Sequence, residues 1–161
     1  QSGFDGLRFE QGSIIDYDAS GADAVIALHA CDTATDDAIF KGIKSGASLI
    51  TVAPCCHKQI RRQMEAKSPG DNLDFLLRHG IFMERQAEMV TDGLRALLLE
   101  QNGYKTKVFE FISDAHTPKN VLIVAEKQAK PADAQAIAAK IAATKAFFGI
   151  DYHHLERLLD A

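Results

Sequence analysis

The residues whose types could do chemistry gather at the ends of two short apolar runs. The first run ends in His29 and Cys31, and the second ends in Cys55, Cys56 and His57. An imidazole titrates near neutral pH and can act as a base, whereas thiolates are nucleophiles and metal ligands. The two clusters therefore point to proton transfer, thiol chemistry or metal binding.

The elements that must position these side chains form a β-α-β unit. Residues 24–28 and 47–52 are continuous apolar runs, typical of parallel strands covered on both faces. We expect Thr33 or Thr35 to cap the helix between them and Gly46 to end it. Ligands bind outside the carboxyl ends of such strands. The reactive side chains should therefore lie together at this rim of the sheet.

Composition bounds the class of protein. The chain has 161 residues, of which 47% are hydrophobic and 25% charged, enough for one domain with a sizeable core. A net charge of -4 gives no global sign of nucleic-acid or membrane binding, although a local basic patch would suffice for RNA. Three cysteines are not a disulfide framework, which favours a reducing, cytoplasmic compartment. Without a membrane-span or signal-peptide pattern, we expect a soluble protein.

The rest of the chain reads as a basic excursion, an antiparallel hairpin and a helical tail. The excursion over residues 58–82 has the position of a lid or substrate-recognition element, and equally of a solvated helix face. We expect Asp151 to cap the last helical turn. The other expected elements are a strand over 7–9, helices over 72–78 and 82–102, hairpin strands over 104–112 and 120–125, and a helix over 131–148.

This order of elements resembles the second half of the Rossmann-like class I S-adenosylmethionine-dependent methyltransferases. Their sheet has seven strands, with the last inserted antiparallel beside the fifth. On that template residues 7–9 match the third strand, the two apolar runs match the fourth and fifth, and the hairpin matches the sixth and seventh. The resemblance implies an α/β fold. Its form would be a Rossmann-like three-layer sandwich with a mostly parallel sheet ending in an antiparallel hairpin, and with the N-terminal strands missing.

Three short motifs carry a narrower resemblance, over residues 27–35, 52–57 and 116–120. They resemble the methyltransferase family found in bacterial proteins and in the methyltransferase half of eukaryotic glutathione S-transferase C-terminal-domain-containing proteins. We therefore expect residues 1–127 to be the C-terminal part of a methyltransferase domain and residues 128–161 to be a helical tail.

The resemblance implies S-adenosylmethionine as cofactor and places part of its site. Gly12, Ser13 and Ile14 match the loop that holds adenine, where Ser13 replaces the more usual Asp. Leu28 and His29 match the strand end where the methyl group meets its acceptor. The Gly-rich loop of the family is absent, since the chain contains no G-x-G-x-G. We therefore expect a truncated domain that binds the cofactor weakly or not at all and is inactive alone.

The roles at the rim stay open. His29 would act either as the base that deprotonates the acceptor or as a pocket wall. Thiolates and imidazoles could hold Zn²⁺ and activate a thiol for methylation, but CxxC pairs are missing and adjacent cysteines on an extended strand point to opposite sides. The sequence therefore predicts no metal, and one of Cys55 and Cys56 in the core. The further rim candidates are Cys31, His57, His116, Lys119 and Asn120.

Three functions follow. The leading one is methyl transfer to an unknown acceptor. The basic residues favour an anionic acceptor, and nucleic acid stays among the candidates. The alternative is a non-catalytic binding or scaffold module on a degenerate methyltransferase sheet. A third is a metal- or thiol-dependent enzyme, including one with a cysteine redox pair. A homo-oligomer through the exposed sheet edge or the helical tail is a further expectation.

Overall fold

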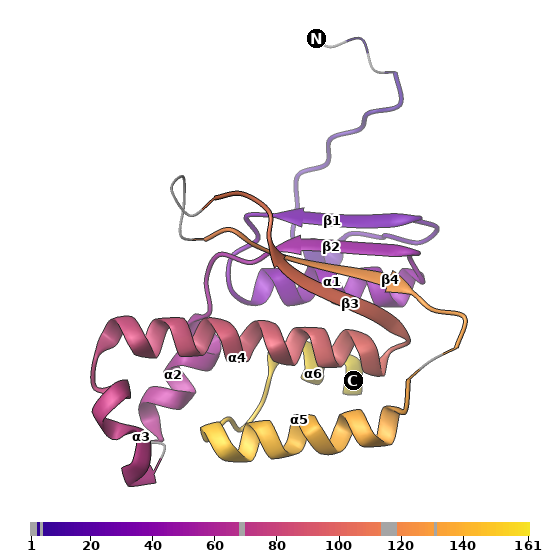
Figure 1. The fold of residues 1–161 in the computed structure, drawn as a ribbon. Coiled ribbons are helices and arrows are strands. Elements are labelled where there is room, and N and C mark those ends of the chain that lie inside the picture. The colour runs from indigo at the N-terminus through magenta and orange to yellow at the C-terminus, as the bar shows by residue number, and fades with distance from the viewer. Residues whose placement is uncertain (1–2, 4, 68–69, 114–118, 131) are drawn as a thin grey trace.

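The computed structural model describes residues 3, 5–67, 70–113, 119–130 and 132–161. No helix in these ranges is both long enough and apolar enough to cross a membrane. The elements in chain order (Figure 1) are η1 (Ile14–Asp16), β1 (Ala24–Leu28), α1 (Thr33–Ser45), β2 (Leu49–Ala53), α2 (Lys58–Ala66), α3 (Gly70–Leu77), α4 (Gly80–Gln101), β3 (Tyr104–Glu110), β4 (Val121–Lys127), α5 (Ala134–Phe148) and α6 (His154–Asp160).

The four described strands form one mixed sheet in the order β1-β2-β4-β3. β1 and β2 are parallel, whereas β4 runs antiparallel to both β2 and β3. The β-α-β unit and the hairpin are as predicted, and the α/β class is confirmed. The expected mostly parallel sheet is wrong for the described residues, because only one of the three strand pairings is parallel.

The helices gather on one face of the sheet (Figure 1). Ile50, Val52 and Ile123 point to that face and are fully buried. On the opposite face Ile26 and Leu28 remain 65% and 59% exposed. The predicted three-layer sandwich is therefore not what the described residues form. The strands read as covered on both faces because both faces are apolar, but the described helices cover one.

The expected strand over residues 7–9 is wrong. The structure has no strand there, and Leu7 and Phe9 are 79% and 90% exposed. A strand needs a neighbour to pair with its backbone N–H and C=O groups, and this segment runs away from the sheet in Figure 1. The short 3₁₀ helix η1 that follows instead packs near α1.

Helix α1 ends as predicted and begins differently. Gly46 follows it in the left-handed conformation, with φ of 71°, as a C-terminal glycine should. Thr33 and Thr35 lie inside the helix and do not cap it, because Asp32 occupies the N-cap position. The Thr35 hydroxyl donates to the Ala30 carbonyl, so its role is to fasten the loop before the helix.

Helix α6 is capped by His153, and the expectation of Asp151 is wrong. The ring Nδ1 of His153 accepts from the Leu155 N–H at 3.2 Å, and the Glu156 side chain accepts from the His153 N–H at 3.4 Å. This reciprocal pair is a capping box built on an imidazole. Histidine is not among the usual capping residues, which is why the sequence pattern missed it.

The C-terminal helices share the core of the rest of the chain. Ile137 and Ile141 of α5 are buried against α4, and Leu155 of α6 is buried beside α1. Figure 1 shows α5 lying along α4 on the side away from the sheet. The division between residues 1–127 and 128–161 stays a prediction.

The burial of His153 predicts a loss of stability in acid. Burial lowers the pKa of this imidazole from 6.5 to about 4, although the nearby Asp36 raises it and Arg95 lowers it further. Between these two pH values the folded state binds fewer protons than the unfolded state. The free energy of unfolding is therefore highest above about pH 6.5. As the pH falls toward 4, the protonation of His153 in the unfolded state lowers it by a total of about 3 kcal/mol.

His153→Asn tests this prediction, because asparagine keeps a capping oxygen and does not titrate. We expect the free energy of unfolding in urea to fall steeply for the wild type as the pH is lowered from about 7 to about 5. The fall should be shallower for the variant. Parallel pH dependence in the two proteins would contradict the assignment.

Candidate functional site

The carboxyl ends of β1 and β2 bring the three cysteines together. Leu28 pairs with Ala53 at the last position of the parallel ladder, so the loops that follow start side by side. The sulfur of Cys31 lies 3.1 Å from that of Cys55, which lies 3.8 Å from that of Cys56. All three sulfur atoms lie within 4.8 Å of one another. The predicted convergence at the rim is thus found for these side chains.

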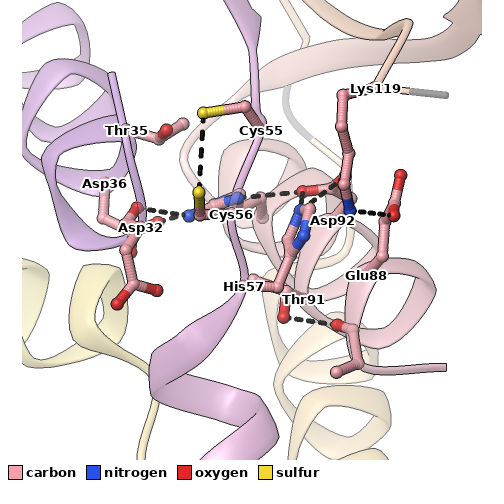
Figure 2. A network of polar contacts seen from close by, with 12 residues as sticks. Asp32, Thr35, Asp36, Cys55, Cys56, His57, Glu88, Thr91, Asp92 and Lys119 are labelled. Carbon is pink, nitrogen blue, oxygen red and sulfur yellow. Dashed lines mark hydrogen bonds and ion pairs between the residues drawn. The ribbon is translucent and has the colours of Figure 1, made fainter. Parts of the chain in front are cut away.

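The expectation that Cys55 and Cys56 point to opposite sides is wrong. Both thiols are half-buried, and they contact each other on the same side of the chain. β2 ends at Ala53, so strand alternation no longer applies to the residues after Pro54. Figure 2 shows the two sulfur atoms joined by a dashed line.

The Cys55 thiol is held in its neutral form. Burial raises its pKa to about 12, and hydrogen bonds with Cys31 and Cys56 add to the effect. The thiolate is the reactive form of cysteine, so this thiol is a poor nucleophile near neutral pH.

A buried ionic cluster lies directly behind the thiols. Arg95 on α4 donates from Nε to Asp36 on α1 at 2.8 Å and from Nη1 to Asp92 at 2.9 Å. Asp92 also contacts His57 Nε2 at 3.2 Å. These four side chains are at most 5% exposed. Figure 2 shows Asp36, Asp92 and His57 converging between α1, β2 and α4.

Arg95 keeps its charge in this apolar setting. Burial lowers its pKa, but the charges and hydrogen bonds of Asp36 and Asp92 outweigh that effect and hold the pKa above its ordinary value. A planar guanidinium suits this arrangement, because its nitrogen atoms can donate to two separate carboxylates at once. The cluster is therefore a permanent ionic centre that links two helices.

The same cluster fixes both rim loops. The remaining Arg95 donor, Nη2, bonds the Asp32 carbonyl at 2.8 Å, and the Asp32 carboxylate accepts from the Gln59 N–H at 3.0 Å. The second bond satisfies a free N–H at the start of α2. His29 and Asp32, on either side of Cys31, have positive φ of 60° and 55°, which L-residues rarely adopt. Such strain persists only where neighbouring contacts impose it.

The other predicted rim residues take different places. His57 is 2% exposed and belongs to the ionic cluster, and Asn120 is 3% exposed and donates to the Ile112 carbonyl across the hairpin. Lys119 contacts Glu88 at 2.7 Å and Glu84 at 3.3 Å, so its charge is paired. Its attraction for an anionic substrate stays a prediction. His116 lies outside the described residues.

The residues predicted to hold the cofactor fall into two groups. Gly12, Ser13 and Ile14 line a hollow of about 410 Å³, and the Ser13 side chain makes no capping hydrogen bond to η1. Leu28 and His29 are exposed at the end of β1. Within the described chain no backbone hydrogen bond joins the two groups, and their part in cofactor binding stays a prediction.

The charged residues of the cluster were missed from the sequence. The available signal is on α4, where Asp92 and Arg95 fall among the buried positions Thr91, Leu94 and Leu98. A charged pair at i and i+3 on an apolar stripe has to be satisfied internally. Asp36 gave no comparable signal, because an acidic residue in the first turn of a helix is also explained by the helix dipole.

The fold and the rim define an α/β domain with reactive side chains beyond the ends of two parallel strands. Residues 1–63 match a family model described as a methyltransferase domain. The match takes in β1, α1, β2 and the three thiols, and it confirms the resemblance to a methyltransferase-domain family over this part of the chain. The chain matches none of the curated proteins and none of the solved structures with which it was compared.

The cluster predicts that Arg95→Met is strongly destabilising. The change leaves Asp36 and Asp92 buried without a cation, and removal of one partner from a buried pair costs about 3–5 kcal/mol. Arg61→Met is the matched control, because Arg61 makes two ion pairs, with Glu65 and Glu84, but is 34% exposed. In urea unfolding, Arg61→Met should lower the free energy of unfolding by less than about 1 kcal/mol.

A triple variant separates lost charge pairing from lost packing. Arg95→Met combined with Asp36→Asn and Asp92→Asn leaves no unpaired charge, so it should be more stable than Arg95→Met alone. Equal losses for Arg95→Met and Arg61→Met would contradict the role of the cluster.

Proposed function

We propose that the protein transfers a methyl group from S-adenosylmethionine to an acceptor at the rim beyond β1 and β2. The observation that carries this proposal is that the methyltransferase-domain match spans both strands and all three rim thiols. The order β1-β2-β4-β3 with an antiparallel β4 also supports it, because it agrees with strands four, five, seven and six of the class I sheet.

His29 is the proposed base. Methyl transfer is an in-line displacement in which the bond from sulfur to the methyl carbon breaks while the acceptor atom bonds that carbon. A protonated acceptor must lose its proton to a nearby base. His29 offers an exposed imidazole at the end of β1, in a strained backbone conformation typical of functional positions. Its alternative role is to shape the pocket.

Two groups of residues are proposed to contact the cofactor. Gly12, Ser13 and Ile14 would hold the adenine, where the Ser13 hydroxyl is free of any capping bond to η1. Leu28 and His29 would line the methyl-bearing side. The chain contains no G-x-G-x-G, so these contacts alone predict a weak affinity.

An anionic acceptor would need basic side chains that are not already paired with acidic ones. Lys67 pairs with Asp151 and Lys119 with Glu88, so these two lysines already have an acidic partner. Lys58 and Arg62 on α2 are exposed and make no salt bridge among the described residues. An anionic acceptor would approach along α2.

A binding or scaffold module is the second candidate. The apolar face of the sheet that the described helices leave exposed, around Ile26 and Leu28, favours it. Monomeric soluble proteins rarely expose a large apolar patch without a functional reason.

Titration with S-adenosylhomocysteine, followed by backbone-amide NMR, tests the proposal even at weak affinity. We expect shifts at Gly12, Ser13, Ile14, Leu28 and His29. Adenosine alone should move only the first three, and Ser13→Ala should reduce the shifts caused by both ligands. Absence of shifts at high ligand concentration, or shifts confined to other elements, would overturn the methyltransferase proposal and favour the binding module.

A further inference from the structure

The three thiols at the rim form a cluster that the proposed methyl transfer does not use. Cys31 comes from the loop after β1, and Cys55 and Cys56 come from the loop after β2. They are all free cysteines, and Cys31 is exposed. The three sulfur atoms lie within 4.8 Å of one another although they come from two separate loops, so adjacency in sequence alone does not explain the cluster.

The sulfur separations suit a tetrahedral thiophilic ion. A zinc–sulfur bond of about 2.3 Å at tetrahedral angles places neighbouring sulfur atoms about 3.8 Å apart. The separation of Cys55 and Cys56 is 3.8 Å, that of Cys31 and Cys55 is 3.1 Å, and the third is no greater than 4.8 Å. Closing these atoms around one ion therefore needs adjustments of about 1 Å or less.

The loops that carry the thiols are already fixed on both sides. The Ala30 carbonyl accepts from Thr35, and the Asp32 carbonyl accepts from the buried Arg95, so Cys31 lies between two fastened positions. His57 follows Cys56 in the chain, and its ring contacts Asp92. Partners of this kind orient metal ligands before the metal arrives.

We propose that Cys31, Cys55 and Cys56 bind one Zn²⁺ ion, with the fourth coordination position open to solvent on the side of Cys31. On binding, each thiol gives its proton to the solvent, so that three thiolates and one divalent ion leave a net charge of -1 at the site. Three protein ligands and one open position are typical of reactive zinc sites. The proposal departs from the sequence-based expectation of no metal. That expectation rested on the missing CxxC pairs and on Cys55 and Cys56 pointing to opposite sides, whereas the loops after β1 and β2 bring all three thiols together.

The open position is suited to a soft ligand. Thiolate ligands select thiophilic ions, and such ions bind a further thiol readily. The described part of the chain offers no fourth His, Cys, Asp or Glu to the cluster. A thiol from solution should therefore complete the coordination.

Metal analysis of the whole chain tests the site. The protein is equilibrated with Zn²⁺ under a phosphine reductant, and we expect about one ion per chain after desalting. Cys31→Ser, Cys55→Ser and Cys56→Ser should each lower the Zn²⁺ affinity by at least about 100-fold. His79→Gln, which removes an exposed imidazole at the start of α4, is the matched control and should leave the affinity unchanged.

Substitution with Co²⁺ keeps the test independent of variants that fail to fold. The wild-type Co²⁺ protein should show intense sulfur-to-cobalt charge-transfer absorption and four-coordinate d–d bands. Added 2-mercaptoethanol should increase the charge-transfer absorption, because a thiol enters the open position. No retained Zn²⁺, Zn²⁺ lost only with His79→Gln, or a cobalt spectrum without sulfur bands would overturn the site. A spectrum indifferent to the added thiol would overturn the open position.

Discussion

Arg95 makes three hydrogen bonds from one buried guanidinium, and the geometry of the rim depends on them. Two reach the carboxylates of Asp36 and Asp92, which ties α1 to α4, and the third reaches the Asp32 carbonyl in the loop after β1. Asp92 in turn contacts His57 in the loop after β2. Desolvation of so many charges is unfavourable, so such a cluster persists only when every partner is present. The consequence is that both rim loops share a single support.

The sheet brings the two loops that Arg95 supports to the same edge. Parallel β1 and β2 end side by side, and the loops that leave them carry His29 and the three thiols to one edge. Positive φ at His29 and Asp32 shows that this edge is held in a conformation which the local sequence does not favour. A methyltransferase-domain match over residues 1–63 and a rim rich in reactive groups therefore describe the same part of the chain.

Much of the fold follows from the sequence, since long apolar runs and glycine stops are local signals. β1 was predicted to the residue, and α1 ends at Gly46 as expected. The strand over residues 7–9 was wrong, because apolar residues alone do not supply a hydrogen-bonding neighbour. The convergence of the cysteines was predictable from strand order, but the shared side of Cys55 and Cys56 was not, because it depends on the turn beyond Pro54. Asp92 and Arg95 lie three residues apart on α4 and leave a local signal, but Asp36 lies on α1, 59 residues from Arg95, so no local pattern reveals the whole cluster.

Hydrogen exchange of an Arg95→Lys variant tests the central claim most directly. Lysine keeps the positive charge but lacks the fork that reaches three acceptors at once. We expect residues 29–35 and 54–59 to lose amide protection together, while β4 and α5 keep theirs. Unchanged protection at the rim, or a loss spread evenly over sheet and helices, would contradict the claim that one buried side chain holds both loops.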